Sequence, residues 1–189
     1  MTDVLQVDGR RAVGDRNRLA ILEAAIRLLG AQPDAGIAEV AGAAGVGRAT
    51  VYRHFASREE LIEALRDRAG EEARLRFAQA RVDDGDPIEA LERIVAAMLA
   101  LGDRYRVIFP QDQEGKPRRS EVLLEPLTRL IARAQATGAI DPGVAPSWVI
   151  AALRALMRSA VGEIEARRLA RDAAPARVVR TLVRGVGCE

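Results

Sequence analysis

Cysteine and histidine are almost missing from this sequence. It contains one cysteine, Cys188, and one histidine, His54, among 189 residues. A single cysteine cannot close a disulfide within the chain, and one cysteine with one histidine cannot supply the ligands of a zinc site. We therefore expect neither a metal site nor a cofactor.

Long apolar runs are also missing. No stretch approaches the ~18 uncharged apolar residues that a membrane-spanning helix needs. The N-terminal residues lack the apolar run of a secretory signal. Because 49% of the residues are hydrophobic and 30% are charged, the chain can still build a core and stay soluble. These features predict a cytoplasmic protein with no membrane partner.

The net charge of +2 is too small to indicate nucleic-acid binding by itself. The basic residues are almost all arginine, and Lys116 is the only lysine. Arginine suits phosphates and guanine edges, but the same bias also arises from a GC-rich genome. Evidence for DNA binding must therefore come from where the charges lie along the sequence.

Apolar residues recur every three or four positions, which predicts an all-α fold. Residues 1–17 lack this periodicity and are expected to form a flexible basic arm. Arginines in and just after this arm could reach a DNA minor groove, but Asp8 and Asp15 dilute their charge and favour a disordered tail. These arginines are Arg10, Arg11, Arg16 and Arg18.

Further signals mark where the helices begin. Ser57 followed by Glu60 has the spacing of a capping box and opens a long helix. Pro87, Pro146 and Pro175 each stand at an expected helix start, and Pro126 is expected to begin or kink another helix.

Residues 37–55 have the pattern of a helix, a glycine-containing turn and a second helix. Ala41 provides a small residue where the helices meet, Gly45 tolerates positive φ, and Val46 seals the corner. This spacing alone fits an ordinary helical hairpin as well as a helix-turn-helix.

The second of these helices has two distinct faces. Val51 and Phe55 are four residues apart and are expected to face the core. The opposite face carries Ala49, Thr50 and Arg53, with Tyr52 and His54 on its flanks. From Val40 through Arg58 the sequence has three arginines, one histidine and no acidic residue. The sequence therefore predicts a DNA-binding surface here.

A lone histidine is more often structural than catalytic, and no serine or cysteine nucleophile has a recognisable partner. The position of His54 beside Arg53 favours a DNA contact over an active site.

The segment AGVGRATVYRHFASREEL at 44–61, preceded by ILEAA at 21–25, resembles the N-terminal domain of TetR-family bacterial transcriptional regulators. The resemblance covers about residues 18–65. It implies a three-helix DNA-binding domain at 18–65, joined by a long helix to a helical ligand-binding and dimerisation domain at 66–189. It also implies contacts of Thr50, Tyr52 and His54 with the DNA backbone. Further contacts implied are those of Arg48, Ala49 and Arg53 with bases and of Arg58 with a phosphate.

The sequence departs from the family pattern before the second helix. The loop at 32–35 is short, and Ala35 and Gly36 stand where the family usually has a capping threonine or serine. Asp34 is the nearest substitute for that cap, but its carboxylate would repel phosphate.

By the same resemblance, the helices after Pro146 and Pro175 are expected to pair with their copies in a homodimer. The alternative is that their apolar stripes form an internal core alone. The stripe after Pro146 consists of Val149, Leu153, Leu156, Ala160 and Ile164. The stripe after Pro175 consists of Val178, Val179, Leu182, Val183 and Val186.

Eight apolar or aromatic residues at helical spacing are candidates for an effector pocket, although residues of these types are more often core. The eight residues are Met98, Leu101, Tyr105, Phe109, Leu127, Ile131, Trp148 and Met157. Their side chains suggest a small, mostly apolar effector.

The sequence therefore predicts a cytoplasmic, homodimeric repressor that binds a palindromic operator and is released by an effector. One alternative is an architectural DNA-binding protein without a ligand. Another is an all-α enzyme, but Glu163, Glu165 and Arg167 are too regularly spaced to be more than a solvated helix face.

Overall fold

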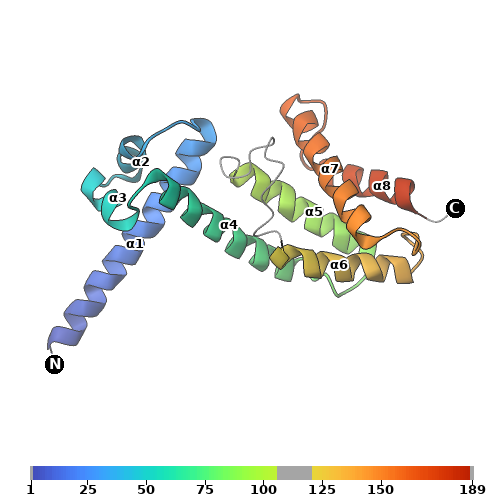
Figure 1. The fold of residues 1–189 in the computed structure, drawn as a ribbon, viewed down its shortest axis with the longest axis horizontal. Helices are drawn as coiled ribbons and strands as arrows, with labels where there is room; N and C mark the ends of the chain where they lie inside the picture. Colours follow the sequence, from blue (N-terminus) through green and yellow to red (C-terminus); the bar gives the residue numbers. More distant parts are fainter. Residues whose placement is uncertain (1, 106–120, 188–189) are drawn as a thin grey trace. The chain divides into compact units, whose positions relative to one another are not determined.

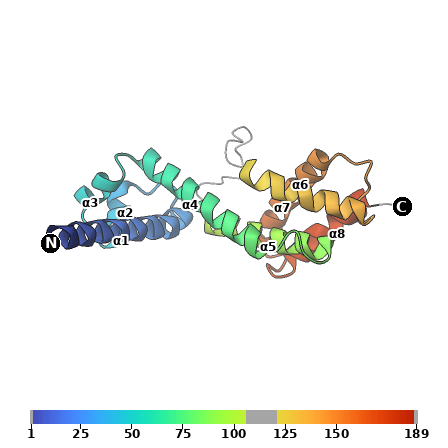
Figure 2. The same ribbon diagram turned by 90° about the horizontal axis from the view of Figure 1, so that it is seen from below.

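The computed structural model describes residues 2–105 and 121–187, and every regular element in those ranges is a helix (Figures 1 and 2). The all-α prediction is therefore confirmed. In chain order the helices are α1 (Thr2–Ala31), α2 (Ile37–Ala44), α3 (Arg48–His54), α4 (Arg58–Gln79), α5 (Pro87–Arg104), α6 (Glu121–Ala136), α7 (Pro146–Glu165) and α8 (Ala174–Val186).

The chain divides into two compact units. The first comprises residues 1–69 and 104–110, and the second comprises residues 70–103 and 111–189. The division falls within α4, four residues beyond the expected boundary at residue 65. One long helix thus contributes to both units.

In the first unit, α1, α2, α3 and the start of α4 surround a small core. The expected stripe of α1 is buried, since Ile21 and Leu29 are fully enclosed. Contrary to the expectation of a flexible arm, α1 begins at Thr2. An apolar stripe occurs in a sequence where one face of a helix is buried. Val13 and Arg16 are exposed, so this part of α1 has no buried face of that kind. A solvated helical extension therefore leaves no periodic signal.

In the second unit, α5 to α8 pack with the end of α4 around a larger core. Leu153 of α7 and Val178, Val179 and Leu182 of α8 are all buried in this core. Leu156 and Val183 are partly buried against this core, and the Val186 side chain lies outside those described. Most of the stripe that we expected to meet a second subunit is thus covered within one chain. The outward side of α8 is polar and carries exposed Arg177, Arg180 and Arg184.

Several helix starts follow the predicted signals. The Ser57 hydroxyl accepts a hydrogen bond from the Glu60 amide at 3.2 Å, which satisfies an otherwise unpaired donor at the start of α4. Proline stands in the first turn of both α7 and α8. Pro126, in contrast, lies inside α6, which begins at Glu121.

The turn between α4 and α5 is tied down by two arginines. Arg93 Nε donates to the Ala80 carbonyl at 2.8 Å, and Arg133 donates to the carbonyls of Val82 and Gly85. Arg81 in this turn has a φ of 49°. The guanidinium groups therefore fix a turn whose backbone includes an unfavourable conformation.

Within residues 2–105 and 121–187, no helix is both long and apolar enough to cross a membrane.

Candidate functional site

The turn between α2 and α3 is closed by Gly45. This residue has a φ of 67°, in the left-handed region that glycine adopts without steric cost. The Val46 amide donates to the Ala41 carbonyl at 3.0 Å and completes the helix end. The expectation that Gly45 supplies the positive φ of a helix-turn-helix is confirmed.

Helix α3 has the two faces expected from its sequence. Val51 and Phe55 are at most 1% exposed, whereas Tyr52 is 54% exposed. The residues expected to approach DNA bases all lie at the surface; they are Arg48, Ala49 and Arg53. Of the three expected backbone contacts, Tyr52 is exposed and Thr50 and His54 are half-buried. The helix therefore presents Arg53 on the side opposite its buried anchors, and Arg48 is exposed in its first turn.

His54 is more enclosed than expected. Its Nε2 atom is buried and has no hydrogen-bond partner among the described residues. The imidazole ring lies 6.4 Å from the Phe55 ring, centre to centre. In this conformation Nε2 is therefore inaccessible to a DNA phosphate.

Helix α1 supplies a cation beside the end of α3. The guanidinium carbon of Arg18 lies 5.2 Å from the centre of the Phe55 ring, within the range of a cation–π contact. Arg18 and Arg16 are exposed, and the side chains of Arg10 and Arg11 lie outside those described. Arg18 thus packs on α3 from a helix, in place of the flexible arm that we expected.

The start of α2 is stabilised differently from the family pattern. Gly36, and not Asp34, is the N-cap residue, and the Glu39 carboxylate accepts a hydrogen bond from the Gly36 amide at 2.6 Å. Arg58 Nη2 donates to the Pro33 carbonyl at 2.5 Å. Neither contact was predicted from the sequence. The spacing of Gly36 and Glu39, which is that of a capping-box pair, was the available signal for the first.

Negative charge gathers at the start of α4. The Glu60 carboxylate accepts a hydrogen bond from the Ala56 amide at 2.6 Å. The pKa of the Glu59 carboxyl is lowered from its ordinary value, chiefly by a backbone hydrogen bond and next by the Ser57 hydroxyl. Ionised carboxylates at a helix N-terminus stabilise the helix through its dipole.

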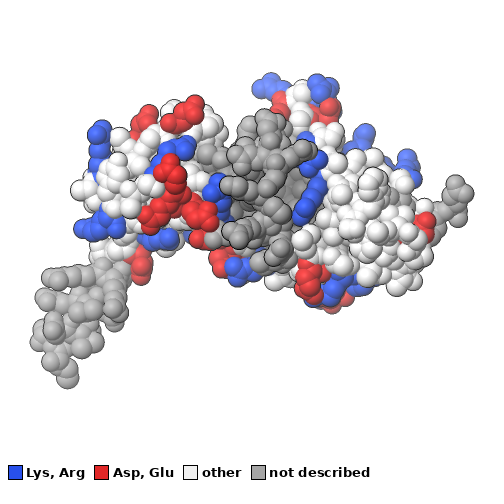
Figure 3. Space-filling model, viewed as in Figure 1, with Lys and Arg blue, Asp and Glu red and all other residues white. Residues whose placement is uncertain are grey.

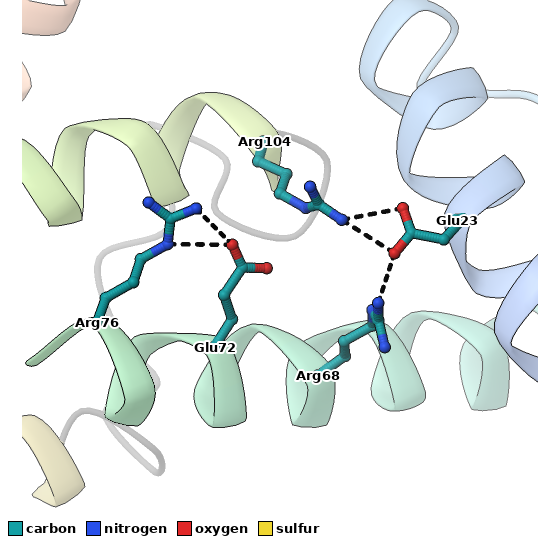
Figure 4. Close-up of polar contacts among 5 residues, drawn as sticks. All are labelled: Glu23, Arg68, Glu72, Arg76 and Arg104. Atoms are coloured by element: carbon teal, nitrogen blue, oxygen red, sulfur yellow. Dashed lines mark hydrogen bonds and ion pairs between the residues drawn. The ribbon is translucent and has the colours of Figure 1, made fainter. Parts of the chain in front are cut away.

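Glu23 of α1 lies between two guanidinium groups (Figure 4). It accepts hydrogen bonds from Arg68 at 2.5 Å and from Arg104 at 2.9 Å. All three residues belong to the first unit. A second pair, Arg76 with Glu72 at 2.7 Å, lies further along α4 in the second unit. The contacts of Glu23 hold the start of α4 against α1, and so support the domain that carries α3.

Most of the expected pocket residues lie in or against the core of the second unit. Leu127 and Ile131 are core residues, and Met98 and Met157 pack against that core. Leu101 is also buried, Tyr105 is buried in the other unit, and Phe109 lies outside the described residues. The residues predicted from the sequence for an effector pocket were Met98, Leu101, Tyr105, Phe109, Leu127, Ile131, Trp148 and Met157.

Trp148 differs most from expectation, since it is 66% exposed and does not point inward. Its neighbour Val149 takes the core position at the start of α7. Helical spacing therefore places Trp148 on the outward side, with exposed Ala151 and Ala155.

A cavity of about 450 Å³ lies instead between the end of α4, the following turn and α6. Phe77, Val82 and Pro126 supply apolar surface to it. Arginine and aspartate side chains complete the wall; they are Arg74, Arg81, Asp83, Asp84 and Arg129. Its volume is in the range of small-molecule sites, about 300–1,000 Å³. Among the described residues, no cluster of histidine, cysteine or carboxylate side chains could hold a metal ion.

In the part of the chain that the structure describes, α2, the turn at Gly45 and α3 form a helix-turn-helix, an arrangement found in DNA-binding proteins. Residues 21–65 match the family described as bacterial regulatory proteins, tetR family. This match confirms the resemblance of residues 44–61 to the N-terminal domain of TetR-family regulators.

Two curated relatives agree with this assignment. The transcriptional repressor LfrR of Mycolicibacterium smegmatis is 38% identical over 88 residues, which are 47% of each chain. The transcriptional regulator NfxB of Pseudomonas aeruginosa is 33% identical over 115 residues, which are 57% of this chain and 60% of NfxB. The matched part thus spans about half the length of these relatives. Both are regulators of transcription and not enzymes.

The similarity to LfrR is also seen in the fold, over most of the chain. The crystal structure of LfrR in complex with proflavine superposes with a TM-score of 0.68 at 26% identity, and covers 93% of this chain and 98% of LfrR. The second unit therefore shares the helical architecture of a TetR-like regulator.

Proposed function

We propose that this chain is a transcriptional repressor that inserts α3 into the major groove of operator DNA. The exposed face of α3 is the observation that carries the proposal. Arg48 and Arg53 are at the surface while Val51 and Phe55 are buried, and no acidic residue occurs between Val40 and Arg58. A helix that carries arginines and no carboxylates fits the electronegative groove.

The residues of this face divide by the contacts that they can make. Arg48 and Arg53 each offer two parallel N–H donors, which match the O6 and N7 acceptors of guanine. Ala49 allows close approach to the base edges. Thr50, Tyr52 and His54 would contact the DNA backbone, with His54 turning outward to do so.

We further propose that two copies read a palindromic operator as a homodimer. The outward side of α7 carries Trp148 and a row of small residues, among them Ala151, Ala155 and Ser159. Figure 3 shows a largely uncharged surface on this side of the second unit, with basic side chains at its margin. Exposed Arg154 and Arg158 of α7 lie beside the row of small residues. Small residues allow two helices to approach closely, and an exposed tryptophan stabilises an interface when it is buried. A symmetric pair would present two α3 helices to half-sites ~34 Å apart.

The effector is proposed to bind the second unit and to favour a dimer whose α3 helices no longer match the groove spacing. Two observations support this: LfrR has been crystallised with proflavine, and this chain has a cavity of about 450 Å³ between α4 and α6. An effector with a mostly apolar body would contact Phe77 and Val82 there, and its polar groups would reach Arg129.

Selection of duplexes from a random-sequence library by the full chain tests DNA recognition. We expect enrichment of a palindrome and binding that weakens as salt rises. Steep salt dependence without any enriched sequence would instead indicate an architectural DNA-binding protein. Release of the selected duplex is then assayed with a panel of small molecules that includes proflavine. The variant Phe77→Ala, which changes the cavity wall and leaves α3 untouched, serves as the comparison for the effector.

A further inference from the structure

We propose that Arg58 is a positioning residue that acts on DNA recognition through α2, and not a ligand of a DNA phosphate. This inference rests on the proposed DNA-binding function. The guanidinium of Arg58 is turned toward the loop before α2. Its Nη2 donates to the Pro33 carbonyl at 2.5 Å, and its Nε lies 3.4 Å from the Ala35 carbonyl. Two of its nitrogen atoms are therefore engaged by the protein itself.

The loop that Arg58 holds leads directly into a helix start that lacks the usual side-chain cap. Gly36 is the N-cap residue and has no side chain that could bind the free amides of the first turn. Glu39 satisfies only the Gly36 amide, from within α2. Arg58 supplies the second constraint, because it fixes the carbonyls just before Gly36 from the start of α4.

The position of α2 controls the position of α3. The two helices are joined by a turn of three residues at 45–47, and Val40 of α2 and Val51 of α3 are both buried in the first unit. A displacement of α2 therefore moves α3. Hydrogen bonds weaken steeply with distance and angle. A small shift of α3 therefore weakens its hydrogen bonds to bases more than its electrostatic attraction to the phosphates.

Hydrogen exchange of the free protein tests the positioning role without DNA. The Ala35 amide bonds to the Gln32 carbonyl and the Val40 amide bonds to the Gly36 carbonyl. In Arg58→Ala we expect both amides to exchange at least about tenfold faster, while the Phe55 amide of α3 changes less than about twofold.

The matched control is Arg66→Ala. Arg66 lies on the same helix and its loss removes the same charge, but it pairs with Glu63 at 3.0 Å. Equal exchange rates in the two variants would overturn the inference.

DNA binding then separates positioning from phosphate contact. On a duplex selected by the wild-type chain, we expect Arg58→Ala to weaken binding about tenfold or more, while binding to a scrambled duplex and the salt dependence stay near wild type. Loss of a phosphate ligand would weaken binding to both duplexes and would lower the salt slope by about 0.9 for each contact. That result would reject the positioning role and leave the repressor function standing. If the wild-type chain selects no duplex, the proposed function fails, and the exchange experiment still decides the role of Arg58.

A second substitution provides a rescue. Gly36 has a φ of −91°, which any residue adopts, and a Cβ atom there would meet only Glu39 Oε2, at 3.5 Å. Gly36→Ser adds an N-cap hydroxyl without steric conflict. In the Arg58→Ala background we expect Gly36→Ser to return the exchange rates of Ala35 and Val40 most of the way to wild type. No recovery would mean that the helix start is not what Arg58 stabilises.

Discussion

Glu23 of α1 accepts a hydrogen bond from Arg68 of α4 at 2.5 Å, and each side chain is 32% exposed. The Nε atom of Arg68 is buried and has no partner among the described residues. The carboxylate of Glu23 is thus the main compensation for a partly desolvated guanidinium. Its removal leaves a charge that water reaches poorly.

We expect Glu23→Gln to destabilise the first unit by about 1–2 kcal/mol, between the values typical of exposed and buried ion pairs. Native-state hydrogen exchange of α1 amides measures this loss. The control is Glu63→Gln in the same unit, since Glu63 pairs with Arg66 at 3.0 Å but is 50% exposed. We expect less than about 0.5 kcal/mol there. Equal losses would show that burial of the Glu23 pair is unimportant.

Arg53 is expected to read one base in each half-site. Arg53→Ala should weaken binding to the selected duplex by about 1–3 kcal/mol and relax the preference at one position. Arg53→Lys keeps the charge and loses the two parallel donors, so it should also relax that preference while keeping most of the salt dependence. Repeating the library selection with each variant measures the effect. An unchanged preference in both would place the base contact elsewhere on α3.

Gly45→Ala tests the turn of the helix-turn-helix. A Cβ atom at Gly45 would meet no atom within 4 Å, so the cost comes from the φ of 67° alone. We expect a loss of about 1–2 kcal/mol, and a smaller loss for Gly45→Asn. Gly42→Ala, three residues earlier in α2, should instead stabilise the unit by about 0.5–1 kcal/mol. Thermal unfolding that ranks these variants otherwise would contradict the assignment of the turn.

Ala155→Glu is expected to separate the proposed dimer. Ala155 is exposed on the outward side of α7, so a carboxylate there leaves the fold of one chain intact but would be buried between subunits. We expect a folded monomer in sedimentation and loss of binding to the selected duplex. Ala96→Glu, at an exposed position of α5, is the control and should remain dimeric.

Trp148 gives an independent measure of the same association, because it is the only tryptophan and is 66% exposed in one chain. Its emission should shift to longer wavelength on dilution, in step with dissociation. A dimer whose emission matches that of the Ala155→Glu monomer would place the interface away from Trp148.

Local pattern was sufficient to predict the buried and exposed sides of α3. Val51 and Phe55 are four residues apart, and this spacing alone determines which side of α3 faces outward. Gly45 was predictable for a similar reason, since a left-handed turn residue is a local requirement. The contact between Arg58 and Pro33 could not be predicted, because it joins residues 25 apart and depends on the path of a loop.

The stripe of α8 shows a different limit. Amphipathic spacing of Val178, Val179 and Leu182 indicates that one face is buried, but not whether α7 of the same chain or a second subunit covers it. The structure assigns it to the same chain. Ending the chain at Asp172 would therefore expose the core of the second unit and would not test the dimer alone.

The turn between α4 and α5 bears on how the protein is digested. Arg81 is exposed and follows the end of a helix, where trypsin usually finds a cleavable bond. Cleavage requires the chain to unwind into an extended strand in the protease groove. Arg93 and Arg133 hold the carbonyls of Ala80, Val82 and Gly85, so this segment cannot extend without breaking those bonds. Limited trypsinolysis should therefore spare the peptide bond after Arg81 despite its accessibility.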